Sequence, residues 1–196
     1  MDGMDEKIFE FAYRMALADA TGQQAYKGQG EGSKTKLRGC SEAKKAVKEY
    51  IEAIFNPDGQ PDFEKTVDQV EKAFEEFLTE ETDGVFTFGN AQKLVNMTAK
   101  YMFMATYDRP ELRPRFAQCH CPMDSIMVGI VVELVKPREE EFGLKRGWIG
   151  SLRKSWSKIT KEDRGQYDQF QELVKGLCSG EDSKMMPIEF DFKNWE

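Results

Sequence analysis

Apolar residues recur along this chain mainly at the spacing of helices. Because an α-helix turns once every 3.6 residues, apolar positions three and four apart lie on one face of it. Three such stripes occur in the N-terminal part of the chain: Ile8, Phe9, Ala12, Met15 and Ala16; Val47, Tyr50, Ile51 and Ile54; and Phe63, Val67, Val70, Phe74 and Phe77. Each stripe predicts a core helix. Strand alternation is almost absent, so the pattern predicts an all-α fold.

Capping and turn residues predict where these helices begin and end. Ser41 is expected to cap the second helix, and a turn at residues 56–59 ends it. Pro61 and Asp62 suit the start of the third helix. Three further helices are predicted at about 90–107, 122–135 and 160–178.

The length of 196 residues suits a single helical domain, residues 1–196, which we expect to form two small lobes around a central cleft. Residues 21–39 hold five glycines and four basic residues, which predicts a mobile basic loop. This loop either becomes ordered on a partner or is a solvated linker. The segment near 185–196 is too aromatic for a disordered tail, so we expect it to dock on the body.

The charge of the chain is acidic but uneven. The formal net charge is -7, which argues against a protein coated in nucleic acid. Residues 109–161, however, contain eleven Lys or Arg against six Asp or Glu. A local basic face is therefore expected within an acidic total.

Neither a membrane segment nor a metal site is expected. No stretch reaches the roughly eighteen apolar residues that span a bilayer, and the N-terminus lacks a basic segment followed by an apolar one, so we expect a cytoplasmic protein without membrane contact. Four sparse cysteines at positions 40, 119, 121 and 178 are expected to be reduced thiols. Cys119, His120 and Cys121 could supply zinc ligands, but adjacent residues would strain the coordination of one ion, so we predict no metal.

The predicted helix at 90–107 carries a polar strip on an otherwise apolar surface. Lys93, Asn96 and Lys100 fall within a sector of about 60°. A helix so apolar should be central, so its lysines must reach a cleft, a partner or the solvent. Asp124 follows Lys93 by thirty-one residues and opens the next helix. An amine and a carboxylate at two helix starts can face one cleft and act together on a sugar.

These two segments resemble a known family. Gly89-Asn90-Ala91-Gln92-Lys93-Leu94-Val95-Asn96 resembles the hairpin and lysine-bearing helix start of the helix-hairpin-helix DNA glycosylases, where Gly-x-Gly-x-Lys-x-Ala precedes an apolar helix. Pro122-Met123-Asp124-Ser125-Ile126-Met127 resembles their Pro-x-Asp segment. The separation of lysine and aspartate is most similar to the archaeal 8-oxoguanine glycosylase branch.

The resemblance implies base excision from double-stranded DNA. The modified nucleotide would be turned out of the duplex into a pocket, and Asp124 would stabilise the oxocarbenium-like sugar as the base leaves. Lys93 would attack the sugar and form a Schiff base, or a water would attack while Lys93 positions phosphate. A monomer is expected, acting in DNA repair or in defence against phage DNA with modified bases.

Two features depart from the family pattern. Ala91 stands where the family often has its second hairpin glycine, and Gly84-Val85-Phe86-Thr87-Phe88 replaces the usual Leu-Pro-Gly, which leaves open whether the hairpin amides bind phosphate. No four-cysteine pattern of the iron-sulfur branch occurs, so no cofactor is expected.

Candidate contacts surround the predicted catalytic pair. Substrate-binding candidates combine amides, cations and aromatic faces: Gln92, Asn96, Lys100, His120, Trp148 and Trp156, with Phe88 and Tyr101 as further aromatic candidates. DNA-binding candidates are Gly89 of the hairpin and the cations Lys145, Arg146, Arg153, Lys154 and Lys158. The alternatives are core packing for each aromatic residue and an ordinary surface loop for the basic segment.

Other functional classes stay open. The main rival is a non-catalytic helical inhibitor or adaptor, which would grip a protein partner with the polar helix strip and the acidic surface. A third hypothesis is a single-strand nucleic-acid binder that uses Trp148 and Trp156 as stacking platforms. The acidic total favours the rival, and the paired motifs favour the enzyme.

Overall fold

A computed structural model describes residues 1, 3–22, 37–78, 85–152, 155–179 and 185–194. The α-helices are α1 (Gly3–Thr21), α3 (Ser41–Phe55), α4 (Phe63–Phe77), α6 (Phe88–Ala105), α7 (Ser125–Val135), α8 (Trp148–Leu152), α9 (Gly165–Cys178) and α10 (Pro187–Asn194). Short 3₁₀ helices are η1 (Arg113–Gln118), η2 (Lys136–Arg138) and η3 (Trp156–Lys158). These ranges contain no strand, so the predicted all-α class is confirmed.

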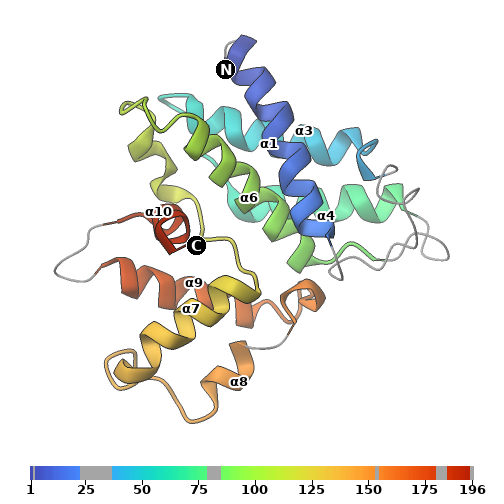
Figure 1. Cartoon of the computed structure of the whole chain (residues 1–196). Coiled ribbons are helices and arrows are strands. Elements are labelled where there is room, and N and C mark those ends of the chain that lie inside the picture. The colour runs from blue at the N-terminus through green and yellow to red at the C-terminus, as the bar shows by residue number, and fades with distance from the viewer. Residues whose placement is uncertain (2, 23–36, 79–84, 153–154, 180–184, 195–196) are drawn as a thin grey trace.

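The helices gather in two groups (Figure 1). One group consists of α1, α3, α4 and α6, and the other consists of α7, α8 and α9. Helix α10 packs on α9, α7 and η1 beside the second group. Helix α6 is central, because it packs on α1 and α4 and also contacts α3, η1 and η3. Its residues are buried almost all round, as expected of a helix surrounded by others.

Local capping chemistry sets several helix starts. Asp62 accepts a hydrogen bond from the Lys65 amide at 3.0 Å, so the predicted cap of α4 is confirmed. The expectation for α3 was wrong by one residue, because Cys40 holds the capping position without a side-chain hydrogen bond and Ser41 is already helical. Helix α6 begins at Phe88 through a capping box between Thr87 and Asn90.

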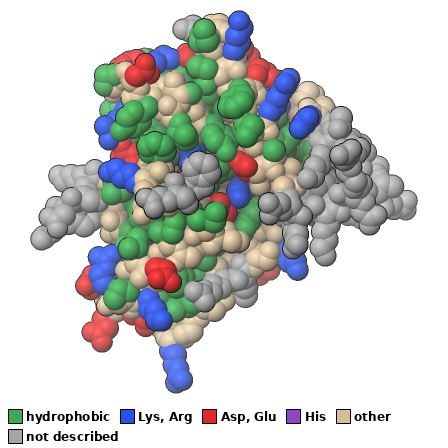
Figure 2. All heavy atoms as spheres, viewed as in Figure 1, with side chains coloured by type: hydrophobic (Ala, Val, Ile, Leu, Met, Phe, Trp, Pro, Cys, Tyr) green, Lys and Arg blue, Asp and Glu red, His purple; other side chains and the backbone are tan. Residues whose placement is uncertain are grey.

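The first stripe predicted a core helix that includes Met15, but Met15 is 40% exposed. Helix α1 packs on α6 through a narrower face, in which Phe9, Ala12 and Ala16 are fully buried. Met15 lies outside that face together with Met4 and Phe11. Figure 2 shows exposed hydrophobic side chains over the part of the molecule where α1 and α6 lie.

The C-terminal segment packs as a helix. Ile188 and Phe190 of α10 are buried, and Glu189 forms an ion pair with Arg113 of η1. Of the predicted basic loop, residues 23–36 lie outside the described part of the chain, as do tail residues 195 and 196. Among the helices described, none has the length and hydropathy that crossing a bilayer requires.

Candidate functional site

Lys93 and Asp124 meet where the two helix groups join. The Lys93 Nζ lies 3.2 Å from Asp124 Oδ2, although the two residues are thirty-one positions apart in the sequence. The side chains are 11% and 17% exposed, so both retain a path to solvent. The amine and the carboxylate are therefore neighbours, as the two motifs predict.

The carboxylate of Asp124 is held from two sides. Its Oδ1 accepts the amides of Ile126 at 3.0 Å and Met127 at 2.9 Å, which makes it the cap of α7. Its Oδ2 faces Lys93. Helix α7 consequently begins at Ser125 and not near residue 122, and one carboxylate oxygen is directed at the lysine by the helix start itself.

Two glutamines hold the extended segment before Asp124. Gln92 of α6 donates to Met123 O at 3.1 Å and accepts from Met123 N at 3.4 Å. Gln171 of α9 donates to Cys121 O at 2.7 Å and accepts from Cys121 N at 3.2 Å. Each side-chain amide thus satisfies both the N–H and the C=O of one buried residue, as the backbone of a neighbouring strand would in a sheet. Gln92, predicted to bind substrate, instead positions the segment that carries Asp124.

Gln171 is a site residue that sequence reasoning missed. It is 3% exposed in α9, beside the buried Tyr167, Phe170 and Val174. A polar residue on the apolar face of a helix was the available signal, because a buried amide needs hydrogen-bond partners.

Asn96 and His120 belong to one internal network. Asn96 Nδ2 donates to Gln92 Oε1 at 3.2 Å and to Tyr167 OH at 3.0 Å, and His120 Nδ1 lies 2.8 Å from the same hydroxyl. Burial, and then the charge of Lys175, lower the pKa of His120 to about 4. Neutral His120 can therefore accept a hydrogen bond from the Tyr167 hydroxyl at Nδ1 and carry its own proton on Nε2. Asn96 is fully buried and His120 is half-buried, and both contact the hydroxyl of the buried Tyr167.

A second ion pair lies deeper. Lys100 Nζ is 2.6 Å from Asp191 Oδ2 of α10, and the side chains are only 1% and 2% exposed. Burial raises the pKa of Asp191, and the charge and hydrogen bond of Lys100 lower it. The charge of Asp124 raises this pKa further, and the charge of Lys93 lowers it. Lys100, predicted to bind substrate, is therefore enclosed and anchors the C-terminal helix. Asp191 was not predicted, although an acid between Phe190 and Phe192 was a visible signal.

Trp156 lies against the predicted nucleophile. The Lys93 Nζ is 4.5 Å from the centre of the Trp156 ring, within cation–π range. The nearby Gly89 is required for packing, because an added Cβ would lie 1.9 Å from the Trp156 carbonyl oxygen. The Gly89 amide donates to Ile159 O at 3.0 Å, so it is already occupied and is not offered to a phosphate.

The remaining predicted contacts are divided between surface and core. Lys145 and Arg146 are exposed before α8, and Lys158 is exposed two residues after Trp156. Trp148 is only 5% exposed, and its Nε1 has no hydrogen-bond partner in the described part of the chain. A base could not stack on Trp148 in this arrangement. Arg153 and Lys154 lie outside the described residues.

The other aromatic candidates face inward as well. Phe88 is fully buried, and its ring meets Tyr167 edge-on with centres 5.4 Å apart. Tyr101 donates a hydrogen bond to Asp19 of α1 at 2.5 Å. Within the described part of the chain, Trp156 is the one aromatic candidate whose ring contacts the predicted catalytic Lys93.

All four cysteines are free and buried. Burial raises the pKa of Cys119 to about 12, so it is a neutral thiol at physiological pH. The described residues contain no group of three or more His, Cys, Asp or Glu side chains that could hold a metal ion.

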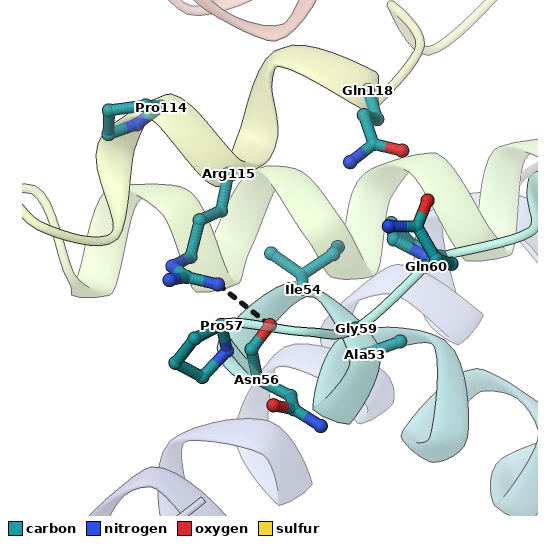
Figure 3. A pocket seen from close by; sticks show the side chains of 10 residues that line it. Ala53, Ile54, Asn56, Pro57, Gly59, Gln60, Pro114, Arg115 and Gln118 are labelled. Atoms are coloured by element: carbon teal, nitrogen blue, oxygen red, sulfur yellow. Dashed lines mark hydrogen bonds between the residues drawn. The ribbon is translucent and has the colours of Figure 1, made fainter.

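A separate pocket of about 310 Å³ lies between the end of α3 and η1 (Figure 3). The side chains of Gln60 and Gln118 border it, and Arg115 donates to the Asn56 carbonyl oxygen at 2.7 Å. None of the predicted site residues lines this pocket.

Comparisons of this chain with protein-family models, with curated proteins and with solved structures gave no match. The resemblance to the glycosylases therefore rests on the two sequence motifs alone.

Proposed function

We propose that this protein is a DNA glycosylase that excises a damaged or modified base. The observation that carries the proposal is the 3.2 Å contact between Lys93 and Asp124 at the junction of the two helix groups. In this proposal the two groups are the two lobes of a helix-hairpin-helix enzyme, and the flipped nucleotide enters a central cleft where the lobes meet. Gly89, Asn90 and Ala91, which were expected to belong to the hairpin, are already part of α6.

Asp124 would stabilise the sugar. Its Oδ1 is committed to the cap of α7, which leaves Oδ2 to face C1′ of the flipped nucleotide. As the bond between C1′ and the base breaks, its electron pair leaves with the base and positive charge develops on the sugar. A carboxylate whose orientation is already fixed stabilises that charge without reorganising.

Lys93 would act as the nucleophile that attacks the sugar. Its ammonium can transfer a proton to the departing base, which leaves a neutral amine beside the sugar cation. The amine then bonds to C1′, and opening of the sugar ring gives a Schiff base. In the alternative course, a water adds to C1′ and its proton goes to the departed base, while Lys93 remains protonated and contacts phosphate.

The surrounding residues would position Asp124, face the flipped base and contact the DNA phosphates. Gln92 and Gln171 hold the segment that carries Asp124, and Trp156 offers the ring face nearest the proposed nucleophile. Lys145, Arg146 and Lys158 are exposed cations suited to the phosphates of a duplex, with Arg153 and Lys154 predicted beside them. A monomer acting in repair or in phage defence fits this proposal.

An excision assay tests it directly. Duplexes that each carry one modified base are incubated with the protein, and abasic sites are revealed by alkaline cleavage. Borohydride should trap a covalent adduct with the wild type and not with Lys93→Ala. Asp124→Asn, which retains the capping oxygen, should lower excision by at least about a hundredfold. Excision that survives Asp124→Asn in a folded protein would refute the proposed role of the carboxylate.

The rival adaptor function is constrained by the same geometry. Its proposed grip was the polar strip of α6 together with the acidic surface. Of the strip, Lys100 and Asn96 are buried and Lys93 is paired with Asp124. A partner would have to open the molecule to touch this strip. Partner binding without such opening must use another surface.

A further inference from the structure

An open groove of about 880 Å³ runs beside α4, on residues that the proposed excision site does not use. One wall is the exposed side of α4, and the other is formed by Val85, Phe86 and residues 160–162. Asp68 and Leu78 mark its extent along α4, and ten residues of helix measure about 15 Å. That length accommodates about four or five residues of extended chain.

The floor of the groove is apolar. Phe74 and Phe86 stack with their ring centres 4.0 Å apart and are almost fully buried, and Leu78 is 8% exposed beside them. Val85, by contrast, is 67% exposed on the wall of the groove. An apolar side chain seated here would remove Val85 from water and pack over the buried rings, which favours binding.

The rim of the groove is acidic. Five carboxylates surround it (Asp68, Glu71, Glu75, Glu76 and Glu162), against two ammonium groups (Lys72 and Lys161). Lys161 pairs with Asp68 at 2.7 Å and Lys72 with Glu76 at 3.6 Å. Burial raises the pKa of Glu71, and the negative charges of Asp68 and Glu162 raise it further. The excess negative charge favours a cationic ligand and repels phosphates.

We propose that this groove binds a Lys- or Arg-rich polypeptide segment that inserts one large apolar side chain onto the Phe74–Phe86 floor. The length of the groove fits a short extended segment, the floor fits the apolar side chain, and the rim fits the flanking cations. Nucleic acid does not fit, because its phosphates would face five carboxylates. A small polyamine would leave the floor unused. The groove would thus link the protein to a basic partner, whether or not the protein excises bases.

Fluorescence anisotropy with synthetic peptides tests the proposal. The probe is a labelled octapeptide of alternating lysine and leucine, and the reference peptide has serine in place of leucine. The leucine peptide should bind at least about tenfold more tightly, because only it can use the floor. Equal affinities would overturn the proposal, since they would reflect only the net charge of the protein. Spermine that competes as well as the leucine peptide would overturn it too.

Surface variants locate the binding. Glu75→Lys reverses a rim charge and Val85→Ser removes the exposed apolar wall, so each should weaken binding of the leucine peptide by about five- to tenfold. Glu140→Lys is the matched control, because it makes the same charge change at an exposed site outside the groove. It should alter affinity less than about twofold. Unchanged affinity in Glu75→Lys and Val85→Ser, or equal weakening by Glu140→Lys, contradicts the assignment.

Discussion

Replacing Gln171 by leucine tests how the segment before Asp124 is held. The Gln171 amide is 3% exposed and contacts both backbone polar groups of Cys121, at 2.7 and 3.2 Å. Leucine has a similar size but no polar atom, so the Cys121 N–H and C=O would both lose their partner. Cys121 is fully buried, so water cannot replace the amide without a cavity opening around it.

The expected cost follows from these two groups. A buried backbone group left without a partner costs about 1–3 kcal/mol, so the pair costs about 2–6 kcal/mol. Burial of the more apolar leucine offsets about 1–2 kcal/mol. At the middle of these two ranges the free energy of unfolding should fall by about 2.5 kcal/mol, which corresponds to a melting temperature lower by roughly 5–10 °C for a chain of this length.

Urea denaturation followed by circular dichroism measures this change. The matched control is Gln118→Leu, because Gln118 is an exposed glutamine. The control should stay within about 0.5 kcal/mol of the wild type. If Gln171→Leu also stays within that range at an unchanged urea dependence, the two hydrogen bonds do not hold the segment and the reasoning is wrong.

Three further predictions concern the buried polar groups and one glycine. Because the folded pKa of His120 is about 4, below its ordinary value of 6.5, the unfolded chain binds more protons between these values. The free energy of unfolding should fall by up to about 3 kcal/mol as pH drops from 6.5 to 4, and His120→Gln should flatten that part of the urea-measured profile. Asp191→Asn should cost about 3–5 kcal/mol by leaving Lys100 buried without a carboxylate, and the double variant Asp191→Leu with Lys100→Met should regain most of it; additive losses in the cycle would contradict the pairing. Gly89→Ala should lower the melting temperature through its clash with the Trp156 carbonyl oxygen, at a cost of about 2 kcal/mol or more; an unchanged melting temperature would show that η3 can move away.

Features that depend on neighbours in the chain could be predicted. The helical stripes around Phe9, Val47 and Phe74 gave the all-α class, because a 3.6-residue period needs no knowledge of what covers it. The caps formed by Asp62 and Asp124 were predicted for the same reason, since a cap binds amides two or three residues away.

The partners of the buried polar side chains depended on how the helices pack against one another. The strip of Lys93, Asn96 and Lys100 was visible in the sequence, but a lysine on an apolar helix can reach solvent, a partner or a carboxylate, and only packing selects among these. Asp191 and Gln171 come from distant helices and were not predicted. Their roles arise because Gln171 of α9 contacts Cys121 and Asp191 of α10 contacts Lys100 of α6, and no local pattern encodes these contacts.

The sequence by itself determined that the chain is helical, where several helices begin, and that Asp124 stands at one such start. Lys93 was expected at another start, but α6 begins five residues before it, at Phe88. Tertiary structure alone decided that these two groups meet at 3.2 Å, that Gln92 and Asn96 are used internally, and that Trp148 is buried while Trp156 lies under the lysine. The physical reason is range: capping and periodicity act over one or two turns, whereas desolvation and ion pairing depend on every element that closes around a side chain.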